Sequence, residues 1–339
     1  MTFYKAGSQW VRDVLADARV LSVTGIQLRT GGIDVPSEAW PEILPGEIAS
    51  PVYCATPREW EMYAAPSDRA VVVLRDPRDI IVSLAASYRT SHAPSNTTRL
   101  LRGPIESASP SHRLLLAMFA FSSWSERLRD WTNPPLSPNV FVTTYCKLVA
   151  DQFGEFARIF DFLEWSIPSP ILRAVVAEHD FASRTGRAPG EENAFSHRRK
   201  GQPGDWRNHF DIETGRAFEE SFPHLLSGLG YEQSDTWWSD LDASRDRAVP
   251  DQVERGQWVS VLEEFATELN VVRTAAAERL SLIESLSAKL QTLEATAAER
   301  ARIIESLHGA RTAVEQSWSY KLGFAPLRRL FGLFKDGSR

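Results

Sequence analysis

Residues 71–83 read VVVLRDPRDIIVS, and these residues give the clearest indication of the fold of the chain. Its first residues form a short, valine-rich apolar run, which is typical of a strand buried on both faces of a parallel sheet. Arg75 follows the run directly, and Pro77 suits the first turn of a helix. Because ligands bind at the carboxyl ends of strands in such sheets, we expect Arg75 to lie at a binding site.

Two further segments have the composition of strands, residues 140–144 and, more briefly, residues 51–54. Amphipathic patterns with the period of a helix occur between and around these strands. The clearest predicted helices cover residues 10–18, 111–130 and 152–163. Strands separated by helices predict an α/β layered domain with a parallel sheet.

Composition excludes several classes of protein. The chain has 339 residues and a net charge of −6, which disfavours nucleic-acid binding, because neutralising phosphates needs a basic surface. Its two cysteines, Cys54 and Cys146, form no CxxC pair, so no zinc site or redox pair is visible. The sequence has neither a run of about 20 apolar residues nor the apolar core of a signal peptide. These features predict a cytoplasmic protein.

Arg75 and Ser83, eight residues apart, form one of three segments suited to bind an anion. An arginine at a strand end can hold a phosphate through two hydrogen bonds, and the serine hydroxyl offers one more. The alternative interpretation is a salt bridge from Arg75 to Asp76 or Asp79 at the strand end.

The second segment is the loop KAGSQW at residues 5–10. Gly7 allows the backbone to approach a ligand, and the free amides at the start of the following helix favour an anion beside Lys5 and Ser8. The loop is not a Walker A motif, because its lysine precedes the glycine.

The third segment is HRRKGQPGDWRNHF at residues 197–210. Its cations precede Gly201 in a loop rich in glycine and proline, which suits closure over an anion. The alternative is a solvated charged loop, and Trp206 argues against it because a tryptophan needs a place to pack.

Taken together and in their order along the chain, the three segments resemble those of the PAPS-dependent sulfotransferases of the cytosolic type, over about residues 3–232. The resemblance implies a P-loop-like three-layer domain with a central parallel sheet flanked by helices. It also implies that the loop at residues 5–10 binds the 5′-phosphosulfate of PAPS, that Arg75 and Ser83 bind its 3′-phosphate, and that Tyr145 and Phe181 lie near the adenine. The residues that it assigns to the cofactor are Lys5, Ala6, Gly7, Ser8, Gln9, Trp10, Arg75, Ser83, Tyr145, Phe181, Arg199, Lys200 and Gly201.

The mechanism that the resemblance implies is in-line transfer of the sulfuryl group to a hydroxyl or amine, without a metal. Lys5 is the cation expected to stabilise charge on the leaving oxygen. The family's usual catalytic base is a histidine whose position falls near Ala55, so this base is missing. His92 and Glu59 are the candidates to replace it, and the alternative is that both are surface residues.

The beginning of the chain also departs from the family pattern. Only four residues precede Lys5, where the family has a full central strand. We therefore expect either that the true start lies upstream or that the site is compromised. A compromised site would make the chain a non-catalytic scaffold that binds PAP or PAPS. A P-loop kinase is a further alternative, which the missing Walker A motif disfavours.

The C-terminal part of the chain has a different pattern. We predict a sulfotransferase domain at 1–232, a polar linker at 233–256 and a coiled coil at 257–317. In the coiled coil, AAERLSLIESL at 276–286 recurs as AAERARIIESL at 297–307, a shift of three heptads that preserves the register of the apolar seam. A seam of this length predicts a homo-oligomer, and the alternative is a lone helix that folds back on the domain.

The last segment, residues 318–339, is a basic tail with an apolar helical face. Such a helix can lie at an anionic membrane surface, so we expect peripheral contact with the inner membrane face. The alternative is that the tail docks on a partner or on its own domain. The ending WSYKLGFAPLRRL at 318–330 resembles the tails of bacterial surface-glycan glycosyltransferases, which implies a glycan or glycolipid acceptor.

Overall fold

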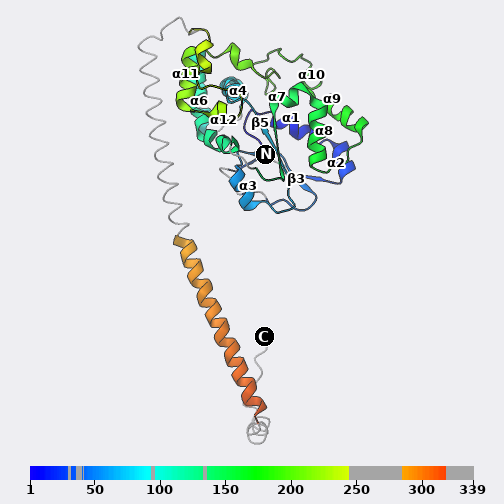
Figure 1. Cartoon of the computed structure of the whole chain (residues 1–339), viewed down its shortest axis with the longest axis vertical. Coiled ribbons are helices and arrows are strands. Elements are labelled where there is room, and N and C mark those ends of the chain that lie inside the picture. Colours follow the sequence, from blue (N-terminus) through cyan, green and yellow to red (C-terminus); the bar gives the residue numbers. More distant parts are fainter. Residues whose placement is uncertain are drawn as a thin grey trace. The chain divides into compact units, whose positions relative to one another are not determined.

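The structure is a computed structural model (Figure 1). It describes residues 1–29, 32–35, 40, 42–92, 96–132, 136–243 and 285–317. The chain divides into two units, residues 1–250 and 251–339, which we describe separately.

A parallel sheet lies at the centre of the first unit. Strand β5 (Ala70–Leu74) pairs with β6 (Val140–Thr144), and β2 (Ile33–Asp34) pairs with β4 (Val52–Tyr53), both in parallel. Thr2 joins the two pairs, because it forms parallel bridges to both Tyr53 and Val73. The order across the sheet is therefore β2, β4, Thr2, β5 and β6. A separate parallel pair consists of β1 (Gln27–Arg29) and β3 (Glu47–Ala49).

Helices cover both sides of this sheet, and Figure 1 shows the two groups with β5 between them. On one side lie α1 (Ser8–Leu15), α2 (Ala18–Thr24), α8 (Gln152–Phe162) and α9 (Ser169–His179), whose apolar residues pack with Val71 and Val73. On the other side lie α4 (Pro77–Thr90), α6 (Pro110–Arg129) and α11 (Ile212–Ser221). The predicted α/β fold with a parallel sheet between helices is confirmed.

Shorter helices complete the first unit. They are α3 (Pro57–Tyr63), α5 (Asn96–Ser107), α7 (Tyr145–Ala150), α10 (Phe181–Thr185), α12 (Leu225–Gly228) and the 3-10 turns η1 (Asp130–Thr132), η2 (Asp205–Asn208) and η3 (Trp237–Asp240).

The folded domain continues beyond the predicted boundary at residue 232. The indole of Trp237 donates to Glu219 (2.9 Å), and the amide of Ile212 donates to the carbonyl of Asp242 (3.0 Å). Gly215 on α11 leaves room for Trp238, since a Cβ there would lie 2.6 Å from the Cβ of Trp238. Two tryptophans therefore anchor residues 233–243, the first part of the predicted linker, on α11. Residues 244–256 lie outside the described residues.

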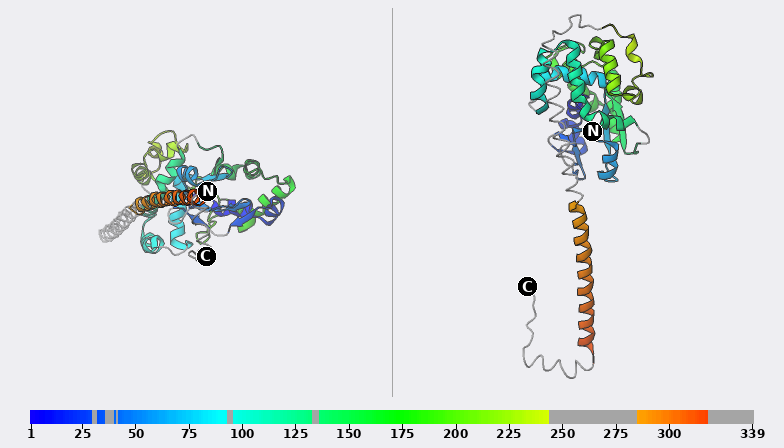
Figure 2. Two further views of the ribbon diagram at one scale, coloured as in Figure 1. Left: turned by 90° about the horizontal axis from the view of Figure 1, so that it is seen from below. Right: turned by 90° about the vertical axis from the view of Figure 1, so that its left-hand side faces the viewer.

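The described part of the second unit is one helix over residues 285–316, also visible in Figure 2. Its apolar residues are exposed, Leu290 by 57% and Leu293 by 66%. The start of the predicted coiled coil and the basic tail, residues 318–339, lie outside the described residues. Among the described helices, none is both long enough and apolar enough to cross a membrane.

Candidate functional site

The loop after the central bridge of the sheet turns sharply into α1. Lys5 and Gly7 both have left-handed backbone conformations, with φ of 66° and 89°. A Cβ at Gly7 would lie 2.9 Å from the ring of Tyr145. Both this close contact and the left-handed backbone require glycine at position 7. Ala6 is fully buried, and α1 begins at Ser8. The loop therefore brings the amides at the start of α1 to the carboxyl end of the sheet.

Arg75, at the end of β5, contacts this loop directly. Its Nη1 donates to the carbonyl of Lys5 (2.8 Å), and its guanidinium lies over the ring of Tyr145, 4.4 Å from the centroid. Its Nη2 is 3.8 Å from Asp79, and its Nε is buried with no partner among the described residues. The salt bridge to Asp79, which was the alternative interpretation, is thus present but long, and Asp76 instead pairs with Arg78 (2.7 Å).

The cationic loop that follows α10 is anchored on α4. The buried carboxylate of Asp79 accepts from the amides of Gly204 (2.7 Å) and Trp206 (3.0 Å). Asp205 forms ion pairs with Arg199 and Lys200. Burial alone would raise the pKa of Asp205, but hydrogen bonds from its neighbours hold this pKa well below its usual range. The loop is therefore an ordered element, in agreement with the expectation from Trp206.

Lys5 is the point where the three segments meet. Burial, followed by the positive charges of Arg75 and Arg199, lowers the pKa of its ammonium to about 8. In the sequence, Arg75 lies 70 positions after Lys5 and Arg199 lies 194 positions after it. The fold thus collects cations from all three predicted segments at one end of the sheet.

Aromatic side chains border the cations. The ring of Trp10 meets that of Tyr145 edge to face, with centroids 6.1 Å apart. Phe181 packs on Gly201, where a Cβ would lie 2.3 Å from the phenylalanine ring, so only glycine fits beside it. Ser83 lies further along α4 and is half-buried, and its hydroxyl has no hydrogen bond among the described residues.

The position expected for a catalytic base is filled by packing. Ala55 is 1% exposed, and its carbonyl accepts from the indole of Trp131 (2.9 Å). Glu59 caps α3 together with Thr56 and forms an ion pair with Arg127. Burial opposes the ionisation of Glu59, but hydrogen bonds from Arg127 and Thr56 outweigh it and lower the pKa of the carboxyl.

His92 has a different environment. Its Nδ1 lies 3.3 Å from the hydroxyl of Ser87, and its ring meets that of Tyr88 edge to face. Burial, followed by the charge of Lys5 and the nearby His197, lowers the pKa of His92 to about 4. His92 is therefore neutral at pH 7 and lies close enough to Lys5 to feel its charge.

Sequence reasoning missed two residues that organise the site. Asp79 had been considered only as a partner of Arg75, although it holds the cationic loop on α4. Tyr53, at the end of β4, lies 3.1 Å from the hydroxyl of Ser8 and accepts from the side-chain amide of Gln9 (3.3 Å). The only available signal for Tyr53 was its place at a strand end in a parallel sheet.

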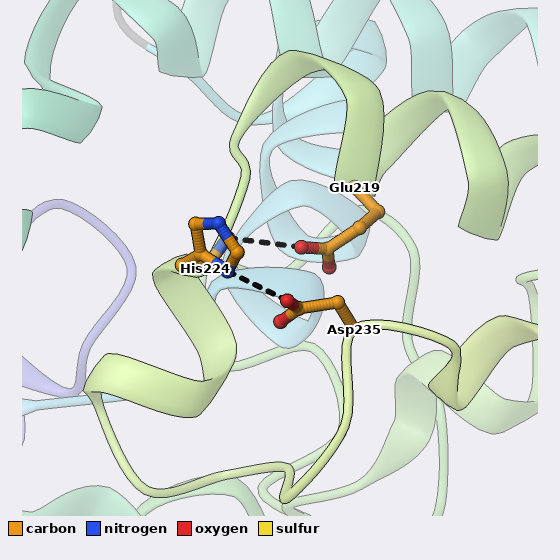
Figure 3. Close-up of side chains that lie close together, drawn as sticks. All are labelled: Glu219, His224 and Asp235. Atoms are coloured by element: carbon orange, nitrogen blue, oxygen red, sulfur yellow. Dashed lines mark hydrogen bonds and ion pairs between the residues drawn. The ribbon is translucent and has the colours of Figure 1, made fainter.

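Glu219, His224 and Asp235 form a group with the spacing of a metal site within the described residues (Figure 3). Each side chain already has a partner. The imidazole of His224 pairs with Asp235 (2.6 Å), and Glu219 accepts from the His224 amide (2.9 Å) and the Trp237 indole. The group thus closes the turn between α11 and α12, and its geometry is explained without an ion.

A cavity of about 120 Å³ lies between α4, the start of α6 and residues 192–199. Its lining combines apolar residues such as Val82 and Leu114 with charged ones, among them Arg199. The cavity therefore borders the cationic cluster on the side of α4.

The chain is similar in sequence to known sulfotransferases. A family model described as a sulfotransferase domain matches residues 62–230. Mouse sulfotransferase 2B1 is 28% identical over 188 residues, and human sulfotransferase 2B1 is 21% identical over 259 residues. These matches cover 52% and 68% of this chain, and the chain spans 53% and 66% of the two relatives. Mouse sulfotransferase 2A2 is 22% identical over 251 residues, which cover 68% of this chain and 84% of the relative.

Among solved structures, mouse sulfotransferase SULT7A1 complexed with PAP matches 68% of this chain and 85% of its own. Its sequence identity is 17% and the TM-score is 0.49. An α/β domain with a cationic cluster at the end of its parallel sheet is the class of protein that the fold and site define. The family match over residues 62–230, together with the curated relatives, supports a place for the chain in the sulfotransferase family.

Proposed function

We propose that this chain is a PAPS-dependent sulfotransferase that transfers the sulfuryl group to a hydroxyl or amine of an acceptor. The observation that carries the proposal is the convergence of Lys5, Arg75 and Arg199 at the carboxyl end of the sheet. Among the described residues, no carboxylate pairs with Lys5. A cluster of three cations of this kind suits a ligand with several anionic groups.

Each part of the donor has residues suited to it. The amides at the start of α1, with Lys5 and Ser8, are suited to the 5′-phosphosulfate. Arg75 and Ser83 are suited to the 3′-phosphate, because each has an unpartnered polar group among the described residues. The further residues that we assign to donor binding are Ala6, Gly7, Gln9, Trp10, Tyr145, Phe181, Arg199, Lys200 and Gly201.

The proposed transfer requires a cation at the leaving oxygen and a base for the acceptor proton. The acceptor oxygen bonds to sulfur as the bond from sulfur to the phosphate oxygen breaks, so negative charge develops on that leaving oxygen. Lys5 would stabilise this charge, since at pH 7 an ammonium with a pKa of about 8 is mostly protonated. The acceptor proton would pass to neutral His92, which we favour over Glu59 because the carboxylate of Glu59 is held by Arg127.

Calorimetric titration with adenosine 3′,5′-bisphosphate tests the cofactor site. Titrations with 5′-AMP and ATP are the controls. We expect tight binding that needs the 3′-phosphate, and a loss of about 10- to 100-fold in Arg75→Ala, because a charge-assisted bidentate contact is removed. Arg58→Ala is the matched control, since Arg58 is an exposed arginine on α3. Equal affinity for 5′-AMP and the bisphosphate would overturn the proposal.

The rival function is a scaffold that binds PAP or PAPS without turnover, which the buried alanine at position 55 favours. Acceptor screening with labelled PAPS separates the two functions. Label transfer to any acceptor that is lost in Lys5→Met supports the enzyme, whereas binding without transfer over a broad acceptor panel supports the scaffold.

For the acceptor, we propose a glycan or glycolipid, on the strength of the C-terminal resemblance. A guinea pig relative, 22% identical over 172 residues, is a 3-beta-hydroxysteroid sulfotransferase, so sterols belong in the same panel. Faster transfer to sterols than to glycans and glycolipids would contradict the carbohydrate assignment.

We also propose that the C-terminal helix pairs with a second copy of itself. Its apolar seam is 53–66% exposed at Leu286, Leu290 and Leu293, and burying such a seam is favourable. In a parallel pair, Lys289 of one copy would flank Glu294 of the other. Sedimentation of Leu290→Ser/Leu293→Ser should give a smaller species than wild type, whereas Ala288→Ser/Ala295→Ser on the opposite face should not. A monomeric wild type would contradict this proposal.

Peripheral membrane contact through the tail, residues 318–339, is a separate proposal that follows from its basic, amphipathic sequence. Flotation with vesicles should show binding to phosphatidylserine that exceeds binding to phosphatidylcholine and that Arg328→Ser/Arg329→Ser weakens. Equal flotation with both lipids would contradict it.

A further inference from the structure

Tyr53 occupies the end of β4, immediately before the segment where a catalytic base was expected. Its ring stacks on that of Tyr4, with centroids 4.5 Å apart and an interplanar angle of 14°. Gly32, on the neighbouring segment, leaves space for the ring, since a Cβ there would lie 3.1 Å from it. The ring is thus held from two sides, and this fixes where its hydroxyl can lie.

That hydroxyl lies at the loop of residues 5–10, where α1 begins. It is 3.1 Å from the Oγ of Ser8 and accepts from the Nε2 of Gln9 at 3.3 Å. Ser8 and Gln9 are the first two residues of α1, and Ser8 is only 9% exposed. Tyr53 therefore links a strand that contributes no cation to the loop that carries Lys5.

The number of protons in this trio has a chemical consequence. Each hydroxyl donates one hydrogen bond and accepts up to two, and the amide of Gln9 already donates to the oxygen of Tyr53. The contact between Tyr53 and Ser8 uses one of the two hydroxyl protons. Whichever residue donates in that contact, one hydroxyl proton remains for an anion at the start of α1.

We propose that Tyr53 is a positioning residue for the 5′-end of the donor, acting through Ser8 and Gln9. This inference rests on the proposed function, because it takes the anion at α1 to be the 5′-group of PAP or PAPS. The fixed ring holds both side chains of the loop in place before the ligand arrives, so less ordering accompanies binding. No titratable side chain is required at Ala55 for this role.

The test compares adenosine 3′,5′-bisphosphate with adenosine 3′-monophosphate, which lacks the 5′-group, on Tyr53→Phe. The phenylalanine keeps the stacked ring and removes only the hydroxyl. We expect about a five-fold loss of affinity for the bisphosphate and less than about a two-fold change for the monophosphate. Tyr63→Phe is the matched control, because Tyr63 is 56% exposed and lies on α3.

A double-mutant cycle with Ser8→Ala sharpens the result. Because Tyr53 acts through Ser8, the double variant should lose less affinity than the product of the two single losses. Unchanged bisphosphate affinity in Tyr53→Phe, an equal loss for both nucleotides, or multiplicative losses would overturn the inference. These outcomes differ from failure of the proposed function, in which wild type itself would show no preference for the bisphosphate, and the inference would fail with it.

Discussion

The two sides of the candidate site are built differently. On the proposed donor side, three separate segments bring Lys5, Arg75 and Arg199 together. The carboxylate of Asp79 holds the loop that carries Arg199. On the acceptor side, Ala55 is buried under Trp131, and Glu59 is occupied by a helix cap and an ion pair. The donor side is thus assembled from the motifs of the family, whereas the acceptor side departs from them.

The comparison indicates what each side contributes to function. Binding of a polyanion needs only cations and backbone amides in place, and the donor side supplies both. Turnover also needs an acceptor proton to leave, and we propose His92, which its lowered pKa keeps neutral at pH 7, as the base that takes it. Variants on the two sides should therefore separate binding from turnover.

The largest effect is expected from Lys5→Met. Removing the cation from the leaving oxygen should lower kcat by about 100- to 1,000-fold, as for the loss of one oxyanion-stabilising group. The same variant should melt at a higher temperature, because burial and two like charges make the ammonium unfavourable in the folded state, as its lowered pKa indicates. Steady-state assays and thermal melts would measure both effects.

Lys147→Met, which removes an exposed lysine from α7, provides the control and should change neither quantity. If Lys5→Met lost stability together with activity, the lysine would be a structural residue and its catalytic assignment would fail.

The next effect in size concerns His92 and pH. A group with a pKa of about 4 gains its proton only as the pH falls through that value, and Lys5 loses its proton as the pH rises through about 8. The profile of kcat/KM should therefore fall below about pH 4 and above about pH 8. His92→Gln should lower kcat by about 100-fold and abolish the acidic limb only.

His308→Gln, a change at an exposed histidine of the C-terminal helix, should leave the profile intact. An acidic limb that persists in His92→Gln would assign the proton transfer to another group.

The sequence could single out the three segments that converge at the proposed donor side, because each of these motifs is local. The strand end at Arg75, the turn at Gly7 and the loop at Gly201 are each defined by a few consecutive residues. Their convergence depended on the sheet, whose parallel strands end at one edge. The sequence could not show that Asp205 would pair with both Arg199 and Lys200, because this depends on side-chain geometry within a turn.

Two other features depended on tertiary contacts. Polar, acidic composition predicted a linker from residue 233, yet Trp237 and Trp238 pack against α11 and keep residues 233–243 folded. The role of Tyr53 likewise follows from its distance to Ser8, across 45 residues of sequence. Composition describes the average of a segment, whereas one or two large side chains determine where it packs.

The smallest effect on activity is expected from Glu59→Gln. The carboxylate caps α3 and pairs with Arg127, so its loss should lower the melting temperature while kcat changes less than about two-fold. Folding stability should also depend on pH through this residue. Because its pKa is lowered in the folded state, its contribution is present above the usual glutamate range and is lost as the pH falls below it.

Glu61→Gln, two residues along α3 and exposed, is the matched control and should alter neither melting nor turnover. A kcat loss of 100-fold or more in Glu59→Gln, with the acidic limb removed, would move the base from His92 to Glu59. That result would require Arg127 to release the carboxylate when an acceptor binds. The acceptor side would then be rearranged by its substrate, in contrast to the preformed donor side.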